Sequence, residues 1–182
     1  MRKLAAVFAL LASPALATGL EIEVSGKANG TIKIDLLEDV APKHVEQIAA
    51  LATEGAYDGV AFHRVIDGFM AQTGDVEFGK VDSGNLASAG SGGSDRPDLK
   101  AEFSNQPFVR GTVGMARSSS PDSGNSQFFI MFQSAPHLDG QYTVVGQVTE
   151  GMEVVDKIKR GSGQSGTVSG KPDVMTKVTV TD

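Results

Sequence analysis

Residues 62–75 of the chain read FHRVIDGFMAQTGD. The turn dipeptide Asp67-Gly68 separates two runs, the first of them rich in β-branched and aromatic residues, so the stretch predicts a β-hairpin. Because side chains alternate along a strand, Phe62, Arg64 and Ile66 share one face. A guanidinium without a partner is costly to bury. Arg64 is therefore either an edge-strand residue with its charge in water or a functional group.

Regular patterns precede this hairpin. Residues 20–24 and 31–36 alternate apolar and polar side chains around Asn29-Gly30, a tight-turn dipeptide, and predict another hairpin. Pro42 suits the first turn of a helix, and apolar residues recur at helical spacing until Gly55 ends the run. These patterns predict a helix between Pro42 and Gly55, with His44 exposed on it.

The chain after residue 75 is less regular. Residues 79–105 have no clear periodicity, and so long a loop in a compact domain is either functional or disordered. Strand patterns return at 111–116, 127–132, 144–149 and 175–181, a helical pattern covers 152–159, and a flexible loop covers 161–170. The total of about eight short strands and two helices excludes a doubly wound α/β fold and favours an all-β sandwich or closed barrel.

Composition removes several function classes. The 182 residues carry 16 basic and 22 acidic side chains, for a formal net charge of −6. This charge argues against nucleic acid as a partner, because phosphate recognition needs a basic face. The absence of cysteine excludes disulfides, thiolate nucleophiles and thiolate metal sites, and three histidines without metal spacing predict no metal site. No G-x-S-x-G pattern is present, so nucleophilic hydrolysis does not fit.

The N-terminus has the pattern of an export signal. A basic start is followed by an uncharged apolar run over residues 4–12, a break at Ser13-Pro14, and small residues at Ala15 and Ala17. We therefore predict that residues 1–17 are a cleaved secretory signal peptide and that residues 18–182 form one domain. The alternatives are an N-terminal membrane anchor and a buried helix. The run is too short to cross a bilayer as a helix, and no second stretch approaches that length, so no membrane span is predicted.

Two strand segments place polar and apolar side chains on a common face. Met70 and Gln72 share a face of one strand, and Gln127, Phe129 and Met131 share a face of another. Each face is either ordinary packing or the wall of a half-polar binding site. The residues alone thus indicate an exported, acidic, all-β barrel with a surface pocket of Arg, Gln, Met and Phe side chains.

Several long segments together resemble the cyclophilin family of peptidyl-prolyl cis-trans isomerases. They are, in chain order, residues 62–75, Gly114-Met115-Ala116-Arg117, Asn125-Ser126-Gln127-Phe128-Phe129-Ile130, and LDGQYTVVG at 138–146. The resemblance covers residues 20–181, and long motifs in a fixed order are far more specific than one short pattern. It implies a cyclophilin-like, all-β fold: an eight-stranded antiparallel closed barrel capped by two α-helices, with the site on its outer face.

The resemblance also implies roles for ten residues at matching positions. Arg64 would be the principal catalytic group. Phe69, Met70, Phe129 and Leu138 would form the pocket for the proline ring, Gln72 and Gln127 would contact the peptide backbone, the Arg117 backbone would pair with the substrate strand, His63 would flank the site, and Tyr142 would form a pocket wall.

Some positions depart from the family pattern. His137 stands where the family frequently has tryptophan, so we expect weakened affinity for the cyclic-peptide inhibitor. Tyr142 replaces the usual histidine, which puts a direct catalytic role there in doubt. The turn at residues 118–124 differs in length and polarity from the commonest form, and no residue of 79–105 is assigned a role.

The implied function is peptidyl-prolyl isomerisation, without a cofactor, on unfolded or partly folded proline-containing chains. The export signal and the 117–126 turn resemble the bacterial periplasmic branch, so we expect a periplasmic monomer that acts on exported proteins, with secretion as the alternative. A second hypothesis is a non-catalytic module that binds proline-containing segments as a chaperone or assembly partner. A sugar-binding barrel is weaker, because it rests on fold analogy alone and the chain has no tryptophan.

Overall fold

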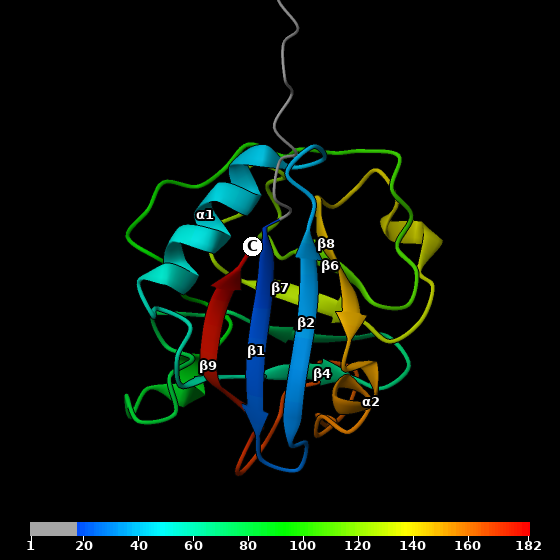
Figure 1. The fold of residues 1–182 in the computed structure, drawn as a ribbon. Coiled ribbons are helices and arrows are strands. Elements are labelled where there is room, and N and C mark those ends of the chain that lie inside the picture. Colours follow the sequence, from blue (N-terminus) through cyan, green and yellow to red (C-terminus); the bar gives the residue numbers. More distant parts are fainter. Residues whose placement is uncertain (1–17) are drawn as a thin grey trace, which may run out of the picture.

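The computed structural model describes residues 18–182, whose strands form one curled sheet that packs against two α-helices (Figure 1). In chain order the elements are β1 (Gly19–Ser25), β2 (Gly30–Leu36), α1 (Pro42–Thr53), β3 (Val60–Ala61), β4 (Arg64–Ile66), β5 (Met70–Thr73), the 3-10 helix η1 (Leu86–Ser88), β6 (Thr112–Met115), β7 (Phe128–Met131), the 3-10 helix η2 (Pro136–Leu138), β8 (Val144–Glu150), α2 (Met152–Val155) and β9 (Val174–Thr181). The predicted signal peptide, residues 1–17, lies outside the described residues. Within 18–182, no helix has both the length and the apolarity to span a membrane.

The nine strands follow the order β3-β9-β1-β2-β8-β6-β7-β5-β4, and all neighbouring pairs are antiparallel. In Figure 1, β1, β2 and β9 run along the front, while β4 and β7 cross behind them. The sheet thus curls into a half-barrel. This confirms the prediction of a mainly β fold with two helices.

The strand count differs from the expected eight because the run 60–66 forms two strands. β3 pairs with β9 and β4 pairs with β5, so they lie at opposite ends of the sheet order. Between them, the Phe62 N–H donates to the carbonyl of Asp173, and the carbonyl of His63 accepts from the Val168 N–H. These two residues bond to the segment that precedes β9, which interrupts the strand.

Both predicted hairpins are present. β4 and β5 pair across a turn in which Gly68 has a φ of 66°, a left-handed conformation that glycine adopts without strain. In the other hairpin Val24 pairs with Gly30, so the turn is longer than the tight Asn29-Gly30 turn expected. The Asn29 side chain supports this turn by donating to the carbonyl of Gly26 at 2.9 Å.

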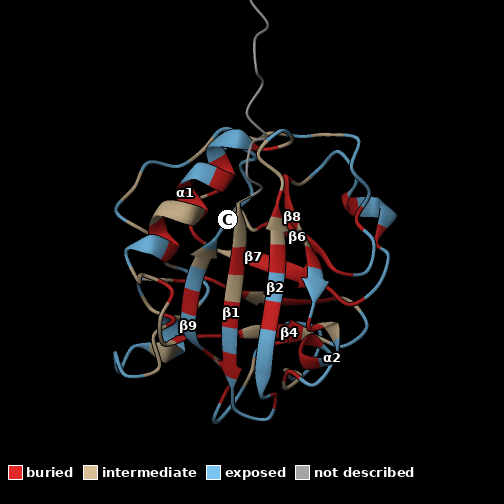
Figure 2. Ribbon diagram, in the orientation of Figure 1, coloured by how far each residue is buried: buried red, intermediate tan, exposed pale blue. Residues whose placement is uncertain are grey.

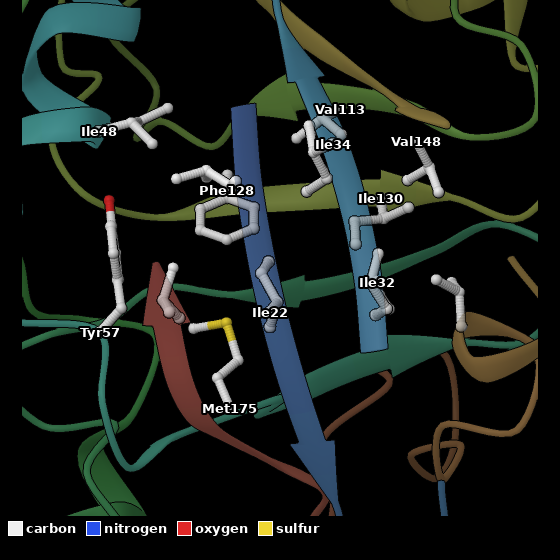
Figure 3. Close-up of a cluster of buried hydrophobic side chains, with 14 of the residues drawn as sticks. Ile22, Ile32, Ile34, Ile48, Tyr57, Val113, Phe128, Ile130, Val148 and Met175 are labelled. Atoms are coloured by element: carbon white, nitrogen blue, oxygen red, sulfur yellow. The ribbon is translucent and has the colours of Figure 1, made fainter. Parts of the chain in front are cut away.

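The main core lies between the front strands and the strands behind them (Figure 3). Ile22 and Ile32 lie on the front strands and Phe128 and Ile130 on β7, and each is at most 1% exposed. Tyr57 closes one side of the core, with its ring edge-on to Phe128 and its hydroxyl bonded to the backbone. Figure 2 shows that buried and less buried residues alternate along the strands. This alternation allows the packing to be predicted from the sequence.

Helix α1 begins at Pro42 as predicted, but its first turn is capped by the long loop. Oε1 of Glu102 accepts from the N–H of Lys43 at 3.1 Å, and Oε2 accepts from the N–H of His44 at 3.0 Å. The same carboxylate lies 2.6 Å from Nδ1 of His44. His44 is only 1% exposed, so the expectation of an exposed histidine is wrong.

Helix α2 is shorter than predicted. It ends at Val155 rather than Lys159, and the chain continues in a tighter turn that bonds the Ile158 N–H to the carbonyl of Val155. Val154, Val155 and Ile158 are nevertheless buried, as their spacing predicted.

Candidate active site

The sheet register brings the candidate residues of three segments together. Arg64 of β4 lies opposite Gln72 of β5, and Gln72 lies opposite Phe129 of β7. Met70 shares the face of Gln72 and pairs with Met131. Because directly opposed side chains on neighbouring strands are in contact range, these residues form one continuous surface.

This surface holds a pocket of about 150 Å³, which we call the small pocket. It is lined by eight of the ten predicted site residues, together with Ala116, which was not predicted: Arg64, Phe69, Met70, Gln72, Arg117, Phe129, Leu138 and Tyr142. Phe129 is 5% exposed, stacks with Phe108 and meets Tyr142 edge-on, both at a ring-centroid distance of 5.8 Å. The aromatic packing gives the small pocket a rigid apolar floor.

The Arg64 side chain is fixed within this pocket by neutral partners. Its Nη1 donates to Oε1 of Gln72 at 3.1 Å, and its Nε donates to the carbonyl of Ser165 at 3.0 Å. Nη1 also lies 3.9 Å from Sδ of Met70. Among residues 18–182 no carboxylate forms a salt bridge with Arg64. The guanidinium therefore keeps its charge and spare N–H groups for a bound molecule.

The hydrogen bonds continue from Arg64 through two carboxamides. Nε2 of Gln72 donates to Oε1 of Gln127 at 2.9 Å, and Nε2 of Gln127 donates to the carbonyl of Gly92 at 2.8 Å. Each carboxamide accepts on one side and donates on the other, so the row fixes both orientations. This row leads from the small pocket to a second pocket.

The second pocket, which we call the large pocket, has a volume of about 480 Å³. It shares Gln72, Ala116 and Arg117 with the small pocket. Polar groups make most of its remaining wall: Gly90, Ser91, Gly92, Gly93, Ser94, Asp98, Ser118, Ser123, Asn125, Ser126 and Gln127. Part of the irregular 79–105 segment is therefore a pocket wall.

Two polar side chains hold this wall in place. Asp75 is fully buried, and its carboxylate accepts from four backbone N–H groups: those of Glu77, Phe78, Gly90 and Gly92. Oδ1 of Asn125 accepts from both the N–H and the hydroxyl of Ser94, each at 2.7 Å. A Cβ on Gly92 would lie only 2.6 Å from Oδ1 of Asp75, so the close approach requires glycine. The cluster Gly90-Ser91-Gly92-Gly93 was the available sequence signal, since glycines often mark close backbone contacts.

His63 lines neither pocket. Its side chain is buried and packs against Gly90, where a Cβ would lie 3.1 Å from the ring. Neither ring nitrogen has a hydrogen-bond partner within the described part of the chain. Burial lowers the pKa of His63, although the nearby charge of Asp75 opposes the shift, so the ring is neutral near pH 7. His63 thus lies behind the wall of the large pocket.

The two positions that depart from the family pattern lie at the edge of the small pocket. His137 is exposed and its ring stacks on Phe69 at a centroid distance of 5.8 Å. Tyr142 presents its ring face to the Arg117 guanidinium, 4.4 Å from the ring centre. Tyr142 is therefore a wall of the small pocket, whereas His137 packs on the wall residue Phe69 without lining the pocket. Within the described residues, no cluster of three or more His, Asp and Glu side chains is placed to hold a metal ion.

Comparisons with known proteins show which family the chain resembles over most of its length. Residues 20–180 match the family model described as cyclophilin type peptidyl-prolyl cis-trans isomerase/CLD. A probable peptidyl-prolyl cis-trans isomerase of Brucella suis is 61% identical over 153 residues, which is 84% of this chain and 78% of that protein. A peptidyl-prolyl cis-trans isomerase of Helicobacter pylori is 42% identical over 136 residues, or 72% of this chain and 76% of that protein.

Solved structures give the same result. A cyclophilin-type isomerase of Cryptosporidium parvum matches with a TM-score of 0.75 at 24% identity, over 92% of this chain and 99% of that one. The same Cryptosporidium protein, crystallised in the presence of the dipeptide Ala-Pro, matches with a TM-score of 0.74 at 26% identity, over 90% and 99% of the two chains. The fold, the family match over residues 20–180 and the long stretches of sequence similarity lead to one conclusion: the chain belongs to the cyclophilin-type peptidyl-prolyl cis-trans isomerases.

Proposed function

We propose that this isomerase accelerates X–Pro bond rotation in exported proteins and that Arg64 is its principal catalytic group. One observation carries the role of Arg64: its guanidinium lines the small pocket beside Met70 and Phe129, bonded to Gln72 and without a carboxylate partner among residues 18–182. A guanidinium with unoccupied N–H groups beside an apolar wall is placed to donate to a molecule bound there.

The chemistry of the bond explains why a fixed donor suffices. Rotation of an X–Pro bond breaks amide resonance, and its barrier of about 20 kcal/mol gives uncatalysed times of tens of seconds or more. In the twisted state the proline nitrogen becomes pyramidal and gains a lone pair. A donor from Arg64 to that lone pair stabilises the twisted state more than either planar state, which lowers the barrier. The reaction forms no bond to the protein, so the step requires no nucleophile.

The neighbouring residues would hold the peptide while the bond rotates. The apolar walls, Phe69, Met70, Phe129 and Leu138, would enclose the proline ring, and Tyr142 would flank it. Gln72 and Gln127 would bond to the peptide backbone, and the Arg117 backbone would pair with the peptide as a strand. The Cryptosporidium relative crystallised with Ala-Pro supports a proline-containing ligand. His63 would act from behind, by packing against the wall that contains Gly90.

The remaining expectations follow from the family and the sequence. β3 and β4 are nearly continuous in the chain and lie at opposite ends of the sheet order, which supports an eight-stranded closed barrel if they count as one strand. We also propose a monomer that is exported by residues 1–17 and retained in the periplasm. His137 at the tryptophan position supports weakened binding of the cyclic-peptide inhibitor.

A binding module on the same scaffold is the second candidate function. It would hold proline-containing segments without needing turnover. The fixed guanidinium of Arg64 favours catalysis, since a module that only encloses a proline ring has no use for a charged donor beside it.

A refolding assay separates the two functions. The substrate is an exported protein whose slow refolding phase is limited by proline isomerisation, and it is present in large excess over the isomerase. We expect residues 18–182 to accelerate the slow phase catalytically and Arg64→Ala to lose the acceleration. Acceleration only at equimolar protein, with Arg64→Ala equally effective, would support the binding module instead.

N-terminal sequencing of the protein from a periplasmic fraction tests export, with Thr18 expected as the first residue.

A further inference from the structure

The two pockets contain the arginines that lack acidic partners. Residues 18–182 include five arginines. Three form salt bridges with carboxylates: Arg96 with Glu54, Arg110 with Asp156 and Arg160 with Asp67. The other two, Arg64 and Arg117, form none within this part of the chain, and both line the small pocket. Arg64 has a role in the reaction, whereas Arg117 has so far been assigned only a backbone role.

The Arg117 side chain is held in one orientation by neutral groups. Its Nε and Nη2 donate to the carbonyl of Gln141 at 3.3 and 3.1 Å, and its Nη1 donates to the carbonyls of Ser118 and Ser119 at 3.0 and 3.4 Å. The face of Tyr142 supports the guanidinium at 4.4 Å. A guanidinium has five N–H groups, so these four contacts leave one free to donate. The charge is therefore preorganised but not neutralised.

The charged side chains that line the pockets place a positive charge on the rim that the two pockets share. Among residues 18–182, the charged side chains that line the small pocket are Arg64 and Arg117, and those that line the large pocket are Asp98 and Arg117. Asp98 is occupied by a hydrogen bond from Nδ2 of Asn125 at 2.9 Å. Arg117 lies on the rim that both pockets share, in a protein with a formal net charge of −6. This local positive charge contrasts with the acidic remainder of the chain.

We propose that Arg117 is a specificity-determining residue, which favours substrates with an acidic side chain next to the proline. The inference rests on the proposed proline site. A peptide with its proline in the small pocket passes the shared rim on its way to the large pocket, and an adjacent carboxylate there can accept from Arg117. Since the guanidinium is already oriented, the contact costs little side-chain entropy.

Isomerisation of short peptides, followed by NMR exchange, tests this proposal. Two series carry Glu, Gln or Lys, one directly before proline and the other directly after it. The measured quantity is the ratio of kcat/KM for Glu to that for the isosteric Gln, so any general loss in a variant cancels. In the wild type at low salt we expect a Glu-to-Gln ratio of about five in one of the series. The corresponding Lys-to-Gln ratio should be below one. The Glu-to-Gln ratio should decline as added salt screens the charges.

Two variants then test whether Arg117 causes the preference for Glu over Gln. Arg117→Gln should bring the ratio to one, whereas Arg110→Gln, which removes the same charge at a distant salt bridge, should leave it unchanged. A wild-type ratio of one in both series would overturn the proposal, as would a preference that survives in Arg117→Gln. A wild type that accelerates no peptide would contradict the isomerase function instead. In that case, the ratio of the Kd values for the Glu and Gln peptides, compared between the wild type and Arg117→Gln, would decide the role of Arg117.

Discussion

The small and large pockets meet at Gln72 and Arg117, yet they are built differently. In the small pocket, strand side chains provide much of the wall, and Arg64, Gln72 and Phe129 are placed by the register of β4, β5 and β7. In the large pocket, a loop provides much of the wall, and its backbone is fixed by the side chains of Asp75 and Asn125.

With the roles proposed for Arg64 and Arg117, this difference separates the catalytic group from the choice of substrate. Sheet register fixes the small pocket through many cooperative contacts, which suits a reaction that needs a donor at a fixed place. The large pocket depends on a few polar contacts, so a single substitution can alter its wall while the sheet stays folded. Loss of these contacts should therefore affect the two pockets separately.

The largest stability effects distinguish the two faces of β7. Phe128 is 1% exposed and packs in the main core, whereas Phe129 forms the floor of the small pocket. We expect Phe128→Ala to cost about 4 kcal/mol of unfolding free energy and to leave kcat/KM of the folded protein unchanged. Phe129→Ala should cost about 3 kcal/mol and also lower kcat/KM about thirtyfold, because the proline ring loses apolar contact.

Urea unfolding and peptide isomerisation measure the two quantities. Equal losses of kcat/KM in both variants, per folded molecule, would contradict the assignment of Phe129 to the pocket and Phe128 to the core.

The second prediction concerns the anchor of the large pocket. Asp75→Asn places an NH₂ group where Gly90 and Gly92 donate, so we expect a loss of about 3 kcal/mol and faster hydrogen exchange at those two amides. Asp173→Asn is a matched control, since Asp173 is also buried and accepts from backbone N–H groups away from both pockets. It should lose stability without accelerating exchange at Gly90 and Gly92. The same exchange pattern in both variants would refute a local anchoring role for Asp75.

The third prediction uses the cap of α1. Burial alone would raise the pKa of Glu102, but hydrogen bonds from His44 and two backbone N–H groups outweigh it, and the pKa lies below the ordinary 4.5. The folded state therefore favours the charged carboxylate. Its contribution is complete above the unfolded pKa and is lost as the pH falls through the lower folded pKa.

Glu102→Gln should cost about 1 kcal/mol at pH 7 and flatten the loss of stability below about pH 4.5. Chemical unfolding across that pH range measures both effects. Glu46→Gln, an exposed change on the same helix, serves as the control and should change little. An unchanged acid dependence in Glu102→Gln would show that other carboxylates dominate it.

The smallest predicted effect is at Tyr142. Its ring contacts Phe129 and Arg117, while no hydrogen bond of its hydroxyl is found within residues 18–182. Tyr142→Phe keeps the ring, so kcat/KM should change by less than about twofold, whereas Tyr142→Ala should lose about fivefold. A loss of about a hundredfold or more in Tyr142→Phe would indicate that the phenol takes part in the reaction, since a general acid–base group typically contributes about 10²–10⁴.

The strand-built part of the molecule was largely predictable from sequence. Alternation placed Met70 with Gln72 and Gln127 with Phe129, and the motif resemblance then joined these segments to Leu138 and Tyr142. The division of 60–66 was not predictable, because it depends on hydrogen bonds to a segment about a hundred residues later.

Residues that depend on distant partners were missed for the same reason. His44 is buried because Glu102, 58 residues later, reaches its side chain and its N–H. The wall at 90–94 has no periodicity, and its structure depends on Asp75 and Asn125. Such side-chain-to-backbone contacts follow no repeat, so a pattern of burial does not reveal them.

Isomerisation of one short X–Pro peptide by residues 18–182, compared with Arg64→Ala, tests the central claim most directly. Circular dichroism should show that both proteins are folded, because the partners of Arg64 are a surface carbonyl and a carboxamide. We expect fast exchange with the wild type and a loss of about 10²–10³ in kcat/KM for the variant. A folded Arg64→Ala that keeps more than about a tenth of the wild-type kcat/KM would contradict the role of the guanidinium at the proline nitrogen.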